Sequence, residues 1–121
     1  MATINSLFHL SRLSGSDPLT IRIGPAITTA DPTGSGTITT EATTDETIVA
    51  SSVTSDTYIF ITNTGSTTSG NVLVTNGQGT QNMALLKPND FLFMPLKGSV
   101  GAKLKYDTSS TTLEWFYWTR G

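Results

Sequence analysis

The chain has 121 residues, a formal net charge of −2 and no cysteine. Its length suits one domain with a buried core, and the missing cysteine excludes a disulfide framework and thiol chemistry. Affinity for a nucleic-acid backbone depends largely on neutralised phosphates, so a slightly acidic chain without a Lys/Arg cluster is not expected to bind DNA or RNA directly. Thr and Ser make up roughly 30% of the residues, well above ordinary usage, which favours β structure.

The first twenty residues can be read in two ways. Their apolar positions would form one stripe of a short helix, but they also alternate with polar neighbours, as in an extended segment. We predict an N-terminal arm over residues 1–20 and a single β domain over residues 21–121. The apolar positions of the arm are Ile4, Leu7, Phe8 and Leu10.

Strand signals remain weak up to residue 56. Residues 19–23 alternate with a period of two, which predicts a short half-buried strand. Residues 28–36 read as a polar loop, and residues 37–39 and 47–49 as weak strand candidates. Residues 1–56 contain a single aromatic residue and bury too little apolar surface to repay their ordering entropy. Three arrangements therefore stay open for them: a flexible tail, packing along the second half of the chain, or packing along another copy.

The aromatic-rich core is expected within residues 57–119. Six runs of branched and aromatic residues follow one another there, separated by Gly, Asn, Pro, Asp or Ser. Turn signals about every ten residues between such runs are typical of an all-β antiparallel sandwich or barrel. The runs are residues 57–62, 71–75, 83–86, 91–96, 102–106 and 113–118.

The last run is apolar on both faces. Leu113 and Trp115 fall on one face, while Phe116 and Trp118 fall on the other. The outer face of a lone two-sheet sandwich should be polar, so we predict that the N-terminal arm or a neighbouring subunit covers it. The predicted interface residues are Ile4, Leu7, Phe8, Leu10, Trp115, Phe116 and Trp118.

No residue pattern indicates a catalytic, metal or cofactor site. The single histidine, His9, has no acid or nucleophile beside it, and acid–base catalysis usually needs a tunable group held by a partner. The acids show no zinc or calcium spacing, and the two G-x-G motifs do not open helices as phosphate loops do. We therefore expect a non-enzyme without a cofactor or small-molecule ligand. The longest apolar run, residues 91–96, is too short to span a bilayer, so no membrane partner is expected.

Three stretches resemble small virion structural proteins of tailed bacteriophages: residues 58–65, 86–96 and 104–107, set in a Thr/Ser/Gly-rich chain. The resemblance implies a head decoration (cement) protein with a jelly-roll-like sandwich domain, often a homotrimer, bound to the major capsid protein. It implies a location on the capsid surface of a virion assembled in the host cytoplasm, and it implies no catalytic residues.

A second function stays open because of the two tryptophans. Exposed aromatics on a β-sandwich can stack against sugar rings, and Trp115 and Trp118 are candidates for such contacts. Tryptophans in an apolar final strand are more often core or interface anchors. The alternative reading is a carbohydrate- or receptor-binding β-sandwich module of a phage tail or fibre.

Overall fold

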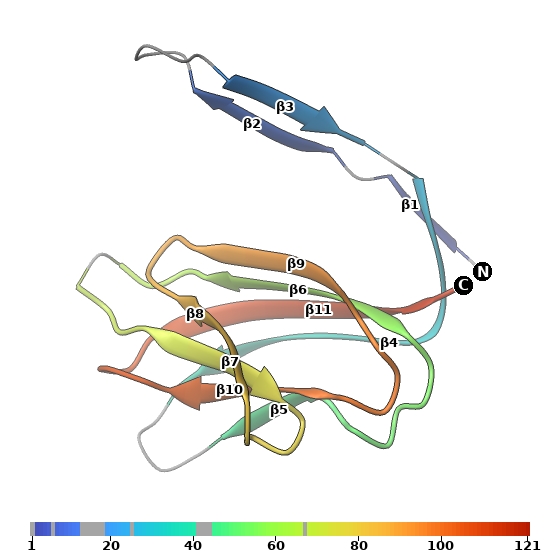
Figure 1. The fold of residues 1–121 in the computed structure, drawn as a ribbon. Helices are drawn as coiled ribbons and strands as arrows, with labels where there is room; N and C mark the ends of the chain where they lie inside the picture. Colours follow the sequence, from blue (N-terminus) through green and yellow to red (C-terminus); the bar gives the residue numbers. More distant parts are fainter. Residues whose placement is uncertain (1, 6, 13–18, 25, 41–44, 67) are drawn as a thin grey trace.

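The computed structural model describes residues 2–5, 7–12, 19–24, 26–40, 45–66 and 68–121, which form eleven strands (Figure 1). The strands are β1 (Ala2–Asn5), β2 (Phe8–Arg12), β3 (Leu19–Ile23), β4 (Ala26–Thr39), β5 (Glu46–Val49), β6 (Thr57–Asn63), β7 (Val72–Asn76), β8 (Asn82–Leu86), β9 (Phe91–Leu96), β10 (Ala102–Tyr106) and β11 (Thr112–Arg120). All six strands predicted in the second half of the chain are present, with ends within two residues of their predicted positions. The strand predicted over residues 19–23 is β3.

Strands β4 to β11 form a jelly roll of two antiparallel sheets. The first sheet has the order β1-β4-β11-β6-β9, and the second has the order β5-β10-β7-β8. From β4 onward, every connection passes from one sheet to the other except the β7–β8 hairpin, which is the double Greek-key pattern of a jelly roll. The predicted all-β antiparallel sandwich of jelly-roll type is therefore confirmed.

The core lies between the two sheets and comes almost entirely from the second half of the chain. Alternate residues of a strand point to opposite faces, so β6 buries Ile59 and Ile61 while Tyr58 and Phe60 face outward. The buried apolar side chains are Ile48, Val49, Ile59, Ile61, Val72, Val74, Leu86, Leu96, Ala102, Leu104 and Leu113.

Strand β4 shows that the prediction of a polar loop over residues 28–36 is wrong. It pairs with β11 in an antiparallel register that places Gly34 opposite Tyr117 and Gly36 opposite Trp115. A Cβ atom on Gly34 would overlap the Tyr117 ring, and one on Gly36 would lie 2.9 Å from Cζ2 of Trp115. These two glycines make room for aromatic rings of the neighbouring strand and do not form a turn.

For residues 26–39 and 46–49, the strand pairing selects one of the three arrangements left open for residues 1–56. Strand β4 pairs with β11, and β5 pairs with β10, so both segments lie along the second half of the same chain. Strand β1 extends the first sheet by pairing with β4, from Ala2 opposite Thr29 to Asn5 opposite Ala26.

Strands β2 and β3 form a separate two-stranded hairpin. Their register places Phe8 opposite Ile23 and Leu10 opposite Ile21. Figure 1 shows the hairpin set apart from the sandwich, on the side of the first sheet that faces away from the second sheet. The predicted boundary between residues 20 and 21 falls inside β3, and the division into arm and domain stays a prediction.

A buried asparagine ties together several loops at one end of the sandwich. The Nδ2 atom of Asn63 donates hydrogen bonds to the carbonyl oxygens of Gly70 (3.2 Å) and Leu86 (3.1 Å). Its Oδ1 atom accepts hydrogen bonds from the backbone N–H of Gly65 (3.1 Å) and from the hydroxyl of Thr111 (2.7 Å). All four hydrogen-bonding positions of the side-chain amide are therefore used inside the protein.

Candidate functional site

Six aromatic side chains lie on the outward side of three adjacent strands, and we call this surface the outer aromatic face. Phe60 in β6 stands opposite Phe93 in β9 and opposite Phe116 in β11. Tyr58 stands opposite Trp118 in the same way. The outer aromatic face consists of Tyr58, Phe60, Phe91, Phe93, Phe116 and Trp118.

The rings of the outer aromatic face contact one another. Their separations suit the attractive offset-stacked and tilted arrangements of aromatic pairs. Ring centroids are 5.9 Å apart for Tyr58 and Phe93, 6.3 Å for Phe60 and Phe91, 6.1 Å for Phe60 and Phe116, and 6.0 Å for Phe116 and Trp118.

Much of this aromatic surface is open to solvent. Phe91 is 55% exposed, Phe93 45% and Phe116 37%. The outer face of an antiparallel sheet that meets water is normally polar, and a contiguous exposed apolar patch marks an interaction site. The arrangement is therefore an exposed apolar surface that is suited to a protein partner or to a ligand with a planar, weakly polar face.

The three predicted interface residues of the last strand lie on two different faces. Phe116 and Trp118 belong to the outer aromatic face, with rings stacked at an interplanar angle of 7°. Trp115 packs against the core from the inner face, and its ring stacks on Tyr117 at 6.3 Å. Its Nε1 atom is buried and has no hydrogen-bond partner among the described residues. The sheet thus separates Trp115 from the other two residues.

The predicted interface residues of the arm lie on the added strands. Leu7, between β1 and β2, is 64% exposed. Ile4 in β1 stands opposite Ile27 of β4. Phe8 and Leu10 lie in β2, whose pairing partner within the described chain is β3.

The predicted interface residues leave out four members of the outer aromatic face, although the sequence of residues 91–94 is, like the last strand, visibly apolar on both faces. Tyr58 and Phe60 alternate with Ile59 and Ile61 along β6, so this strand is apolar on both faces, like the last strand. Strand β9 shows the same double pattern, which contributes Phe91 and Phe93. The sequence pattern identifies three strands that are apolar on both faces. Only their pairing shows that the outward side chains form one continuous surface.

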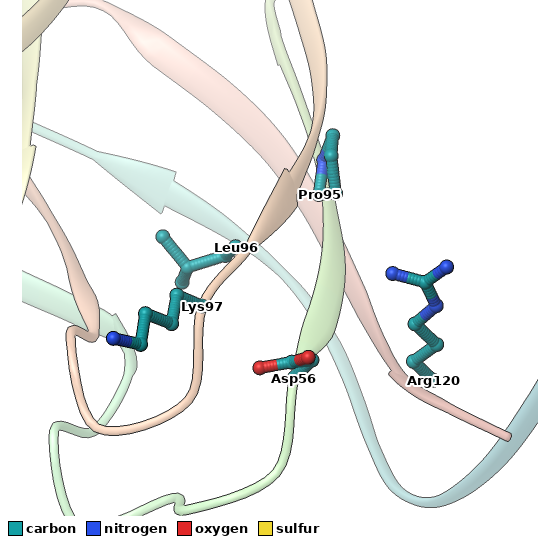
Figure 2. Close-up of a pocket in the computed structure, with 5 residues that line it drawn as sticks. All are labelled: Asp56, Pro95, Leu96, Lys97 and Arg120. Carbon is teal, nitrogen blue, oxygen red and sulfur yellow. The ribbon is translucent and has the colours of Figure 1, made fainter.

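A charged rim borders the outer aromatic face at the end where β9 and β11 finish (Figure 2). A shallow pocket of about 210 Å³ opens there. The guanidinium carbon of Arg120 lies 5.8 Å from the Tyr58 ring centroid, within the range of a cation–π contact. The backbone N–H of Gly98 donates to Oδ1 of Asp56 at 2.8 Å. The lining residues are Asp56, Pro95, Leu96, Lys97 and Arg120.

The described part of the chain contains no group of three or more His, Cys, Asp or Glu side chains placed to hold a metal ion. It also contains no helix that is long and apolar enough to cross a membrane.

Comparisons with known proteins assign no function to this site. No family model matches the chain, and no curated protein matches it. Among solved structures, the chain is similar to one described as an ethanolamine utilization protein Q from Salmonella typhimurium LT2. The TM-score is 0.41 and the sequence identity 11%, over 100% of each chain. A likeness at this level carries no functional argument.

Proposed function

We propose that this chain is a non-enzymatic structural protein of a tailed-phage virion, which decorates and stabilises the capsid by binding the major capsid lattice. The outer aromatic face carries this proposal. A free-standing domain exposes few large apolar patches, because they promote non-specific association. A protein that works inside an assembly uses such a surface for permanent contacts, in which aromatic side chains supply much of the binding energy.

Two other features support the proposal. Jelly rolls occur in viral capsid proteins, although they also occur in lectins and other proteins, so the fold alone does not name a function. The cysteine-free, Thr/Ser/Gly-rich sequence resembles small phage virion proteins and agrees with assembly inside a cell, where thiols stay reduced. The resemblance implies several copies per site, as a homotrimer.

The direct test is to locate the protein in particles of the phage that encodes it, by cryo-electron microscopy. We expect density for a two-sheet jelly roll on the outer surface of the head, at contacts between capsomers. Density confined to the tail or neck would overturn the decoration role, and so would purified particles that lack the protein.

Replacing Phe93 with threonine is expected to weaken binding to the assembled partner by about 10- to 100-fold, because a central ring of the apolar surface is removed. The free energy of unfolding should fall by only about 1–2 kcal/mol, since Phe93 loses its stacking on Tyr58 but is half exposed and threonine suits a strand. Co-sedimentation with capsids measures the binding, and urea denaturation measures the stability.

The matched control for this variant is Leu85→Thr. Leu85 is 43% exposed and lies on β8 of the second sheet, away from the outer aromatic face. We expect capsid binding by the Leu85 variant to equal that of the unaltered protein. Equal losses of binding in both variants would contradict a specific role for the outer aromatic face.

One observation favours the carbohydrate- or receptor-binding alternative. The stacked rings of Phe116 and Trp118 form a flat platform with two charged residues, Glu114 and Arg120, on the same side of β11. The other candidate tryptophan, Trp115, packs inside the sandwich. Glycan-array binding that is lost in Trp118→Ala would support this function. An unaltered protein that binds no glycan would count against it.

A further inference from the structure

The β2–β3 hairpin needs a surface to pack against. Among the described strands, β2 pairs only with β3, and a lone two-stranded hairpin is at best marginally stable in water. The antiparallel register and the period of two place Phe8 and Leu10 on the same hairpin face as Ile21 and Ile23. One face of the hairpin is therefore apolar along most of its length.

The chain's own hairpin does not cover the outer aromatic face. Figure 1 shows the hairpin and the first sheet as separate layers. The exposures of Phe91, Phe93 and Phe116 apply to the whole chain with the hairpin present, and all three rings remain accessible to solvent. One chain therefore has two apolar surfaces that do not pack against each other.

We propose that the β2–β3 hairpin of a second copy of this chain packs on the outer aromatic face, so that neighbouring copies exchange hairpins. The hairpin has two strands of five residues, and the outer aromatic face spans three strands of six to nine residues. The hairpin is therefore shorter and one strand narrower than the outer aromatic face, so it fits within this surface. The proposal concerns contacts between copies of this chain, and it goes beyond the proposed capsid role.

The exposed area of the outer aromatic face suits an exchange in which each chain both donates and receives a hairpin. The exposed parts of its six rings sum to about 400 Å², taking roughly 150–250 Å² for each whole ring. A stable interface buries about 800 Å² on each partner. One hairpin contact supplies half of that area. A two-fold dimer in which each chain both donates and receives a hairpin buries about 800 Å² on each partner, whereas a larger closed ring divides the same area between two interfaces.

Charge adds attraction between the hairpin of one copy and the domain of another. Residues 1–25 contain two arginines and one aspartate, whereas residues 26–121 contain five lysines and arginines and eight acids. Arg12 occupies the same hairpin face as Phe8 and Leu10 by register. Glu114 is exposed on β11, next to the outer aromatic face. The net charges of +1 for residues 1–25 and −3 for residues 26–121 favour association, and they favour an orientation that brings Arg12 toward Glu114 and away from Arg120 at the other end of β11.

Cysteine cross-linking between two differently tagged chains tests the exchange, because the protein has no cysteine of its own. One chain carries Leu10→Cys on the apolar hairpin face, and the other carries Thr62→Cys on the outward side of β6. A short bis-maleimide should join the two tagged chains at least ten times faster than in the control mixture. The control replaces Leu10→Cys with Ser11→Cys, on the opposite hairpin face.

Two cross-linking results would overturn the proposal. The first is equal cross-linking in the test and control mixtures, including none in either. The second is a mixture without cross-links combined with an internal cross-link in the double variant L10C/T62C, because the hairpin would then cover its own sheet.

Sedimentation of the full chain provides an independent readout. We expect the unaltered protein to form a dimer or trimer at micromolar concentration, and Leu10→Asp to raise the dissociation constant at least 100-fold. Ser11→Asp, on the opposite hairpin face, should leave the mass unchanged, and circular dichroism checks that both variants keep the jelly roll. A strictly monomeric unaltered protein would refute the exchange even if it binds capsids. An oligomer that does not bind capsids would refute only the capsid role.

Discussion

Replacing Asn63 with alanine is expected to lower the free energy of unfolding by about 3 kcal/mol. The substitution removes four side-chain hydrogen bonds at a position that is 0% exposed. It leaves the carbonyls of Gly70 and Leu86 without their amide donor. A buried polar group without a partner costs about 1–3 kcal/mol, and local rearrangement recovers part of the sum. Urea denaturation followed by circular dichroism measures the loss.

The control for Asn63 is the same substitution at an exposed asparagine. Asn82 lies at the start of β8 and is exposed, so Asn82→Ala should change the free energy of unfolding by less than about 0.5 kcal/mol. Asn63→Asp tests the donor half of the amide by itself, because the carboxylate keeps acceptor oxygens but has no N–H donors. A loss below about 1 kcal/mol in Asn63→Ala would contradict the role of this residue in joining the loops.

Replacing Gly36 with valine is expected to destabilise the fold by about 2–3 kcal/mol, because the added side chain meets the Trp115 ring. Ser35→Val is the matched control, since Ser35 faces outward on the same strand and stands opposite Phe116. Valine suits a strand at that position, so the control should stay within about 0.5 kcal/mol of the unaltered protein. Thermal denaturation of both variants gives the comparison.

A double variant tests whether the ring causes the effect at Gly36. Gly36→Ala combined with Trp115→Phe should lose about 1 kcal/mol less than the sum of the two single losses, because the smaller ring leaves room for the added methyl group. Strictly additive losses would indicate that strand propensity, and not contact with Trp115, explains the glycine.

The strands of the second half could be predicted from sequence because their signal is local. In β6, aromatic and branched apolar residues alternate over four positions, from Tyr58 to Ile61, and Asn63 and Gly65 then mark the end of the strand. The turn after β7 is equally local. Asn76 accepts hydrogen bonds from the backbone N–H groups of Thr80 and Gln81, and Gly79 adopts a positive φ of 71°. Each of these choices depends on residues close in the chain.

Strand β4 could not be predicted in this way. Its Gly34-Ser35-Gly36 segment has the composition of a loop, and only the rings of Tyr117 and Trp115 explain the two glycines. Those rings belong to the opposite end of the chain. A prediction based on local propensity fails where a partner distant in sequence sets the side-chain size.

The candidate site was also predictable only in part from local sequence. The doubly apolar pattern of the last strand was enough to predict an outer face in need of a cover, and Phe116 and Trp118 do lie on an exposed aromatic surface. The pattern does not say which of the two faces points inward. Trp115 faces the core because its register with β6 places it opposite Ile61, which is buried between the two sheets.

The sequence by itself determined that the chain is all-β, where most strands lie, and that more apolar surface exists than one sandwich interior needs. These properties follow from the period of two and from turn residues, which act over a few positions. Only the tertiary structure decided the jelly-roll order, the placement of β4 beside β11, and the joining of rings from β6, β9 and β11 into one outer aromatic face. Sheet pairing depends on contacts between segments far apart in the chain, and no local pattern specifies them.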